Sequence, residues 1–166
     1  FREALLRSVT EVAGTFDIDP PARYEGVYSD RRRASGFALY NSLGITREDT
    51  EGKIRQGMEN FRFFGAPHLA IVTSEADLGG YGLIDCGGYI ANFLLAAASL
   101  GVASIAQAAI ANYSNVVREH FAIPEHRRVL CGISFGYSDR EHPANSFRTD
   151  RAEVEDMAEF RGFLTS

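Results

Sequence analysis

The sequence has no tryptophan and little cysteine, methionine or proline, with two, two and five of these among 166 residues. Two cysteines are too few for the disulfide framework of a small secreted protein. Cys86 and Cys131 both lie among apolar residues, which predicts packed, reduced thiols. A hydrophobic content of 45% gives a chain of this length enough core to fold without disulfides or a structural metal. We therefore expect a single domain over residues 1–166.

Lysine is almost absent, because Lys53 is the single lysine and the other basic residues are arginines scattered among acidic ones. The net charge is −5, and the one basic run, at residues 31–33, is typical of a solvated helix end. Nucleic acid is therefore not an expected partner. No apolar run approaches the roughly 20 residues that cross a bilayer, and no secretory signal opens the chain. We expect a cytoplasmic protein with no membrane partner.

Signatures of several enzyme classes are missing as well. The four histidines fall in different predicted elements without ligand spacing, so no metal site is expected. We expect no Gly-x-Ser-x-Gly nucleophile elbow of the serine hydrolases, and there is no Gly-x-x-x-x-Gly-Lys phosphate loop. Hydrolysis and phosphoryl transfer therefore lose their simplest support.

Hydrophobic periodicity and turn residues predict both helices and strands. Helices are expected over residues 1–9, 29–43, 46–65 with Thr46 as its cap, 83–100, 114–121 and 152–163. Strands are expected over 67–73, 102–109 and 128–137, the last of them central, with a long surface loop at 14–28 and a turn at 79–80. This order predicts a mixed α+β fold in which helices cover a small sheet.

Residues 83–100 are apolar on nearly every side, which predicts a helix that is buried all round. Small residues such as Ala96, Ala97 and Ala98 permit close approach of another helix. Such a helix suits the centre of a dimer as well as the core of a domain, and its composition does not choose between the two.

Two segments carry candidate binding residues. Residues 101–109 form a strand of small residues that lets a flat ligand approach the main chain, although a packed core strand has the same composition. In residues 145–151, Arg148 and Arg151 stand beside hydroxyl groups and are suited to holding a phosphate. The alternative for this segment is a pair of exposed arginines bridged to Asp150 and Glu153.

A succession of short motifs resembles the nitroreductase family, and the match is collinear from about residue 31 to residue 163. Each motif alone is weakly specific, whereas their order and spacing together are more so. The motifs are Leu39-Tyr40-x-x-Leu43-Gly44-Ile45, Asn60-x-x-Phe63-Phe64-Gly65-Ala66-Pro67, Asp85-x-Gly87-x-x-x-x-Asn92, Gln107-Ala108, Gly132-Ile133-Ser134-Phe135-Gly136 and Arg148-Thr149-x-Arg151.

The resemblance implies a dimer with an FMN at each of two sites between subunits. It implies that the main chain of residues 104–108 lies along the flavin, with the amides of Gln107 and Ala108 facing its N5 and O4 region, and that Arg148 and Arg151 hold the phosphate. Tyr40 and Phe64 are weaker candidates for the substrate pocket, and no side chain is expected to be catalytic. The cofactor-binding segment is Ser104, Ile105, Ala106, Gln107 and Ala108, in which Ala106 stands where many relatives have proline.

The function implied by the resemblance is an FMN-dependent oxidoreductase with NADPH or NADH as electron donor and a nitroaromatic or quinone-like acceptor. The expected mechanism is ping-pong hydride transfer through flavin N5. The alternatives are other flavin chemistry on the same fold, such as dehalogenation or flavin breakdown, and a flavin-free dimer with a binding or structural role. The last alternative follows from a further expectation, that the family's N-terminal arginine-and-serine segment is missing before Phe1.

Overall fold

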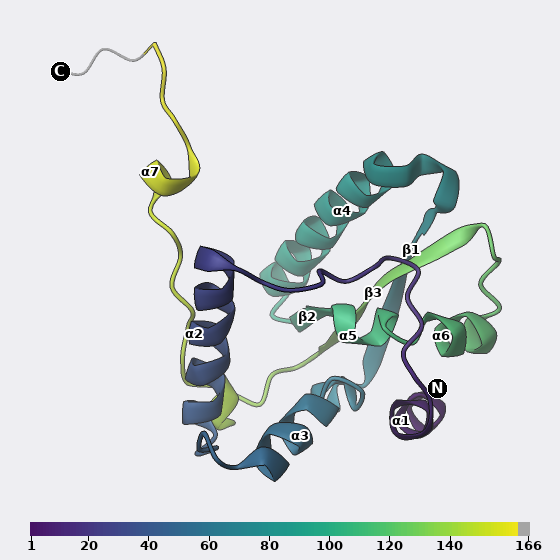
Figure 1. The fold of residues 1–166 in the computed structure, drawn as a ribbon, viewed down its shortest axis with the longest axis horizontal. Helices are drawn as coiled ribbons and strands as arrows, with labels where there is room; N and C mark the ends of the chain where they lie inside the picture. The colour runs from purple at the N-terminus through teal and green to yellow at the C-terminus, as the bar shows by residue number, and fades with distance from the viewer. Residues whose placement is uncertain (163–166) are drawn as a thin grey trace. The chain divides into compact units, whose positions relative to one another are not determined.

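A computed structural model provides the structure, which describes residues 1–162. The chain divides into two compact units. The first unit comprises Phe1–Tyr24 and Arg47–Asp139, and the second comprises Glu25–Thr46 and the chain from Arg140. Figure 1 shows the elements of both units as a ribbon. The expectation of a single domain stays a prediction.

The first unit is built on a three-stranded antiparallel sheet. Its strands are β1 (His68–Glu75), β2 (Ala103–Gln107) and β3 (Arg127–Gly136), in the order β1-β3-β2. The prediction of a central strand at 128–137 is therefore confirmed, and so is the mixed α+β fold. A register shift between Val72 and Thr73 interrupts the pairing of β1 with β3.

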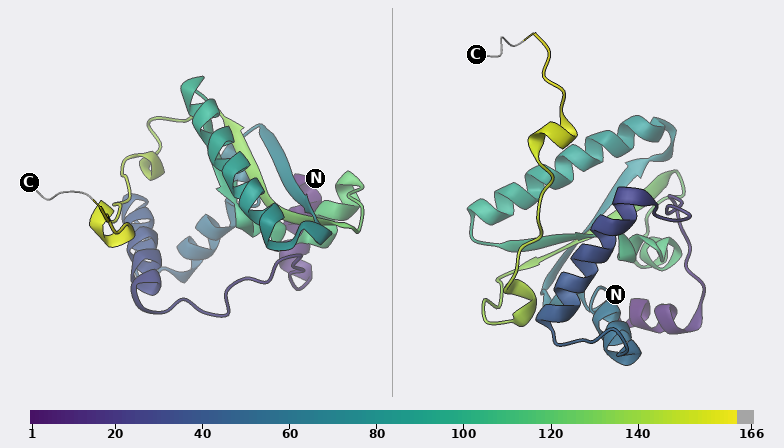
Figure 2. Two further views of the ribbon diagram at one scale, coloured as in Figure 1. Left: turned by 90° about the horizontal axis from the view of Figure 1, so that it is seen from above. Right: turned by 60° about the vertical axis from the view of Figure 1, so that its left-hand side comes forward.

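The two faces of this sheet carry different helices, as the views of Figures 1 and 2 agree. On one face, Val72, Cys131 and Ile133 pack against side chains of α4 (Gly79–Ser99). On the other face a second apolar cluster forms, whose buried members come from α1 (Arg2–Glu11), α5 (Ala108–Ala111), α6 (Ser114–Phe121), β3 and the turn after α3. These members are Leu5, Phe63, Ile110, Val117 and Val129. Val129 and Cys131 are two residues apart, so strict alternation would place them on the same face. The register shift opposite Val72 and Thr73 lies between them, so the one central strand supplies both clusters.

The segment predicted as one helix over 46–65 is shorter than expected. The helix α3 spans Thr50–Met58, and its cap is Asp49, whose Oδ1 accepts a hydrogen bond from the Gly52 amide at 2.7 Å. A carboxylate three residues before an amide is a strong helix cap, which explains why Thr46 is not the cap. A 3-10 turn, η1 (Phe63–Gly65), follows, and Phe63, Phe64 and Gly65 have φ of 60°, 50° and 77°. A right-handed helix cannot include such residues.

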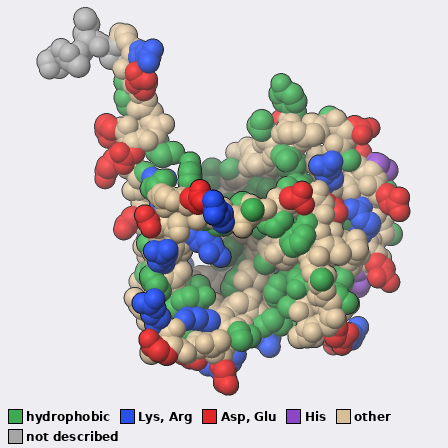
Figure 3. Space-filling model, viewed as in Figure 1, with side chains coloured by type: hydrophobic (Ala, Val, Ile, Leu, Met, Phe, Trp, Pro, Cys, Tyr) green, Lys and Arg blue, Asp and Glu red, His purple; other side chains and the backbone are tan. Residues whose placement is uncertain are grey.

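The helix α4 begins at Gly79 rather than at residue 83, after the short turn η2 (Ala76–Leu78), so residues 79–80 open the helix instead of preceding it. The prediction that this helix is buried all round is wrong for the chain by itself, because Gly82 is its only buried residue among those described. Its outer side is exposed and apolar, with Ile84 at 71% and Leu95 at 70% exposure. Hydrophobic side chains stand at the surface over α4 (Figure 3).

Two loops around α6 also differ from expectation. The helix begins at Ser114, as predicted, but the Ser114 hydroxyl donates to the Thr15 carbonyl instead of capping the helix. Thr15 also pairs with Tyr113 as an isolated bridge, so the first residues of the loop predicted over 14–28 are joined to the residue before α6. The strand predicted over 102–109 ends at Gln107 because α5 starts directly after it.

In the second unit, α2 (Gly26–Ser42) begins three residues earlier than predicted and ends before Gly44, whose φ is 67°. A short turn, η3 (Pro143–Asn145), contacts it. The helix predicted over 152–163 is reduced to α7 (Val154–Met157), and residue 163 lies outside the described residues. Residues 151–162 are all exposed, and so short a helix without a packed apolar face is marginal by itself.

The cysteines are free thiols, as the composition predicts. Cys131 is buried in the cluster under α4, and Cys86 packs against that cluster from the helix. Burial raises the pKa of the Cys131 thiol, and the nearby Cys86 raises it further. The Cys131 thiol therefore stays protonated and unreactive near neutral pH.

A buried carboxylate ties the N-terminal segment to the sheet. Asp17 Oδ2 accepts a hydrogen bond from the Val129 amide at 2.7 Å and pairs with the Arg118 guanidinium. Arg118 also donates to the carbonyl of Pro124 at 2.7 Å. Both side chains of the pair are mostly buried, at 19% exposure for Arg118 and 15% for Asp17.

Replacing Asp17 by alanine is expected to lower the free energy of unfolding by about 3 kcal/mol, because it leaves the mostly buried Arg118 without its counter-charge and the Val129 amide without its acceptor. The measurement is urea unfolding followed by circular dichroism. The matched control is Glu59→Ala, which removes the partner of Arg62 in a pair that is 49% and 36% exposed. Exposed pairs contribute about 0.5 kcal/mol. Equal losses for the two variants would contradict the anchoring role of Asp17.

Candidate functional site

The strand β2 forms an exposed edge of the sheet in the described part of the chain. Its residues Ala103, Ile105 and Ala106 are exposed, and Ser104 is half-buried. In an antiparallel edge strand, every second residue turns its N–H and C=O groups away from the sheet. The side chains here are mostly small, so a flat ligand can reach those main-chain groups. Of the two interpretations of this segment, the structure therefore favours an accessible strand over a packed core strand.

The last residue of β2 differs from the rest, because Gln107 is only 2% exposed. Its Nε2 donates to the main-chain carbonyl of Asn60 at 2.8 Å, and its Oε1 accepts a hydrogen bond from the Ser134 hydroxyl. The side chain is therefore fully engaged inside the unit. Only the main chain of Gln107 is in a position to serve a ligand at the strand edge.

Ser134 fits the sequence pattern of a catalytic serine, but its position in the fold does not suit that role. Residues 132–136 match Gly-x-Ser-x-Gly, the pattern of a serine nucleophile elbow. An elbow is a sharp turn between a strand and a helix, whereas Ser134 lies within β3 and is 1% exposed. Its hydroxyl is occupied by Gln107. The Gly-x-Ser-x-Gly pattern is therefore present, contrary to expectation, but its serine lies buried within a strand.

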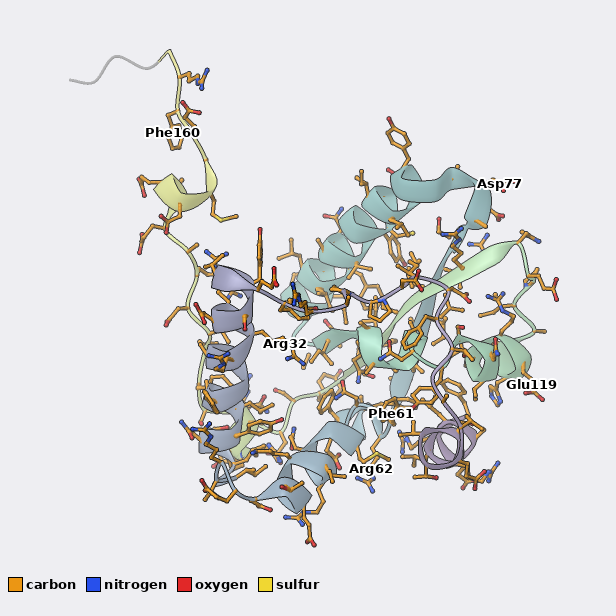
Figure 4. All side chains as sticks on the ribbon, in the orientation of Figure 1. Arg32, Phe61, Arg62, Asp77, Glu119 and Phe160 are labelled. Atoms are coloured by element: carbon orange, nitrogen blue, oxygen red, sulfur yellow. The ribbon has the colours of Figure 1, made fainter. Side chains whose placement is uncertain are left out.

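The turn after α3 displays one aromatic side chain and buries another. Phe61 and Arg62, labelled in Figure 4, lie where this turn leaves the helix. Phe63 is 6% exposed and stacks on the Phe1 ring, with centroids 5.9 Å apart, whereas Phe64 is 41% exposed. Phe64 is thus placed at the surface, as a pocket-lining residue must be.

The predicted phosphate-binding arginines lie in the second unit. Arg148 Nη1 donates to the carbonyl of Phe147 at 2.7 Å, and Arg151 Nη1 donates to the Thr149 hydroxyl at 2.7 Å. Both guanidinium groups are exposed. Within residues 1–162, carbonyl and hydroxyl oxygens thus take the place of the alternative ion pairs with Asp150 and Glu153.

A cavity of about 590 Å³ opens in the second unit beside Arg151. It brings together residues of α2 and of the chain after η3, namely Arg31, Ser35, Thr149, Asp150, Arg151, Ala152 and Met157. The basic run at 31–33 gave the only sequence signal for Arg31, and a solvated helix end was expected there. Tyr40 lies on α2 in the same unit and is half-buried. The structure thus groups Arg151 with a second arginine that the motifs do not include.

The predicted site residues fall into two groups. Residues 104–108 and Phe64 belong to the first unit, and Tyr40, Arg148 and Arg151 belong to the second. Within residues 1–162, no three His, Cys, Asp or Glu side chains are placed to hold a metal ion.

The comparison with known families is decisive for this chain, because residues 15–137 match the model of the Nitroreductase family. The chain belongs to the nitroreductase family. The matched region contains β2, the turn with Phe64, and Tyr40, whereas Arg148 and Arg151 follow it.

Individual nitroreductases resemble the chain over most of its length. It is 40% identical over 157 residues to a 4-nitrobenzoate reductase of Nocardioides sp. (strain LMS-CY), covering 93% of this chain and 62% of that protein. It is 36% identical to Nitroreductase NfnB of Mycolicibacterium smegmatis, covering 95% of this chain and 68% of the relative. The chain thus spans less than two thirds of the length of the first of these relatives.

Solved structures agree with the family assignment. The crystal structure of the FMN-dependent nitroreductase NfnB from Mycobacterium smegmatis in complex with NADPH matches with a TM-score of 0.89 and 34% identity, covering 96% of this chain and 72% of that one. The FMN and NADPH-dependent NfnB from Sphigopyxis sp. strain HMH matches with a TM-score of 0.93 and 27% identity, covering 98% and 74%. The nitroreductase-like fold is therefore shown.

Proposed function

We propose that this protein is an FMN-dependent NAD(P)H oxidoreductase that reduces nitroaromatic compounds. The observation that carries the proposal is the exposed edge strand β2, whose small side chains leave its main chain open to a flat ring. The names of the relatives support the same chemistry, since one is a 4-nitrobenzoate reductase and another an FMN-dependent nitroreductase in complex with NADPH.

The residues present fit FMN in two respects. Ala103, Ser104 and Ala106 leave room for an isoalloxazine ring along the strand, and the main-chain amides of Gln107 and Ala108 are the proposed donors to the N5 and O4 region. The exposed guanidinium groups of Arg148 and Arg151 are the proposed phosphate ligands, because arginine pairs with phosphate through charge-assisted hydrogen bonds.

The protein's contribution to the reaction is binding and orientation. When bound, FMN would supply the redox chemistry, which is the ping-pong transfer of a hydride from NADPH or NADH through N5 to a nitroaromatic or quinone-like acceptor. Main-chain donors at the β2 edge orient the ring and favour negative charge at its pyrimidine end. Phe64 and Tyr40 are the proposed contacts of the acceptor, and no side chain is required as a nucleophile.

We further propose a homodimer that covers the outer face of α4 with a second copy of this chain. Residues Ile84, Gly88, Ala91 and Leu95 form an exposed apolar stripe along this helix. By length and composition alone, Ala76–Ser99 is long and apolar enough to cross a membrane, contrary to expectation. However, the inner side of α4 packs on the sheet, and the glycine and alanine in the stripe suit the close approach of an identical helix.

The free thiols of Cys86 and Cys131 favour a reducing compartment. We therefore propose that the enzyme works in the cytoplasm.

The experiment that tests the function is a visible absorption spectrum of the purified protein after incubation with FMN and gel filtration. Flavin retained at about one per chain, and bleached by NADPH or NADH, is the expected result. An acceptor screen with 4-nitrobenzoate, a quinone and a halogenated aromatic then separates nitroreduction from other flavin chemistry. A colourless dimer would overturn the proposed function and favour a flavin-free role.

A further inference from the structure

The buried side chain of Gln107 joins two parts of the first unit that lie far apart in the sequence. Its Nε2 bonds to the Asn60 carbonyl at 2.8 Å and approaches the Asn60 side-chain oxygen at 3.4 Å. Its Oε1 accepts from Ser134 on the central strand. Gln107, the last residue of β2, is therefore bonded to Asn60, which lies just before the turn that contains Phe64.

That turn is strained. Phe63 and Phe64 both have positive φ, at 60° and 50°. Bulky residues adopt this conformation at a cost, and it persists only where surrounding contacts hold it. Residues other than glycine with positive φ cluster at active sites, ligand clamps and switch regions.

The contacts that hold the turn are present on both sides of it. Before the strained pair, Phe61 packs edge-on against Tyr113 at 5.5 Å, and the Asn60 carbonyl is held by Gln107. After it, Arg2 Nη2 donates to the Ala66 carbonyl at 3.0 Å. Phe63 is the buried anchor between these two points. The side chain left at the surface is that of Phe64.

We infer that Gln107 is a positioning residue, whose side-chain amide holds the strained turn through Asn60 so that Phe64 keeps one orientation at the surface. The inference rests on the proposed function in one respect, since the ligand at the edge of β2 is taken to be FMN with a nitroaromatic acceptor. The main chain of Gln107 serves the cofactor, whereas its side chain sets the aromatic wall against which the acceptor packs. Losing the side-chain bond therefore affects the acceptor more than FMN.

The test compares Gln107→Met, which keeps the volume of the side chain and removes both hydrogen bonds, with the unchanged protein. Hydrogen exchange of the peptide covering residues 60–66, corrected for intrinsic rates, is expected to be about tenfold faster in the variant, since one of the contacts that hold the turn, a buried hydrogen bond, is lost. With FMN bound, the KM for 4-nitrobenzoate is expected to rise about tenfold, which is a larger change than in kcat or in the FMN dissociation constant.

Two further variants separate positioning from general stability. Gln107→Glu cannot donate to the Asn60 carbonyl when ionised, but its protonated carboxyl can. Burial raises the pKa of a carboxyl, and position 107 is 2% exposed. Acidification from pH 8 to pH 5 should therefore restore the slow exchange of residues 60–66 in this variant and not in Gln107→Met. Ile133→Val, on the opposite face of the sheet, removes one methyl group from a fully buried side chain and should leave that peptide unchanged.

The outcomes distinguish the inference from the proposed function. Unchanged exchange of residues 60–66 in both Gln107 variants would overturn the inference, whether or not flavin binds. Faster exchange with an unchanged KM for 4-nitrobenzoate would overturn the link between the turn and the acceptor. An unchanged protein that retains no FMN would overturn the proposed function and with it the role assigned to Phe64, while the exchange data would still decide whether Gln107 holds the turn.

Discussion

Replacing Arg148 and Arg151 together by alanine is expected to weaken FMN binding by about a hundredfold or more. Hydrogen bonds to a charged group contribute about 1.5–3 kcal/mol each, and the double variant removes at least two from the phosphate. Both guanidinium groups now bond to nearby carbonyl or hydroxyl oxygens at the surface, and a phosphate offers a more strongly charged acceptor. The measurement is FMN fluorescence quenching titrated with protein at constant ionic strength.

The control for this variant is Arg161→Ala in the same unit. Arg161 is exposed and pairs with Glu159 at 2.8 Å, so its removal takes away one positive charge of the unit without touching the proposed phosphate ligands. FMN affinity should change less than about twofold, because charges at the surface are screened by salt. The oligomeric state should be the same in all variants. If the double variant binds FMN as well as the unchanged protein, the phosphate assignment is wrong.

Replacing Leu95 by glutamate is expected to convert the protein from a dimer into a monomer at micromolar concentration. Leu95 is 70% exposed in the single chain and lies in the apolar stripe of α4. In a symmetric dimer each substitution occurs on both sides of the interface, so two carboxylates are buried at once. Burying an unpaired charge costs several kcal/mol, which raises the dimer dissociation constant by about a thousandfold or more.

Sedimentation velocity at several concentrations measures this effect. Ile54→Glu is the matched control, because Ile54 is also apolar, 61% exposed and part of the same unit, but it lies on α3. That variant should sediment like the unchanged protein. A Leu95→Glu protein that remains dimeric would show that the second copy does not bind on this face of α4.

The sheet could be predicted from sequence, whereas the local geometry of the candidate site could not. The apolar run at 128–137 is enough to indicate a buried central strand, because a strand covered on both faces has few polar positions. The burial of α4 could not be predicted, because an apolar helix has the same sequence whether a core or a partner covers it. The two faces of this helix differ only in the folded chain, where the sheet covers the inner face and leaves the outer one exposed.

The turn at Phe63 and Phe64 escaped prediction for a different reason. Left-handed conformations are expected of glycine or asparagine, and nothing in an aromatic pair signals them. Long-range bonds hold this turn, including the one from Gln107, which lies 47 positions further along the chain. Asp17 is similar, because its partners Arg118 and Val129 lie far away in sequence. Pattern and spacing describe neighbours along the chain, and these contacts depend on the completed fold.

The strand order β1-β3-β2 also bears on how the chain is made. Every interstrand pair in the sheet includes β3, although β3 is the last of the three strands in the sequence. During synthesis, β1, α4 and β2 therefore leave the ribosome before the strand that pairs them exists. Transiently exposed apolar segments of this kind are the substrates of chaperones. The sheet thus depends on β3 for every strand pair, and nascent chains that stop before residue 127 are expected to carry two unpaired, aggregation-prone strands.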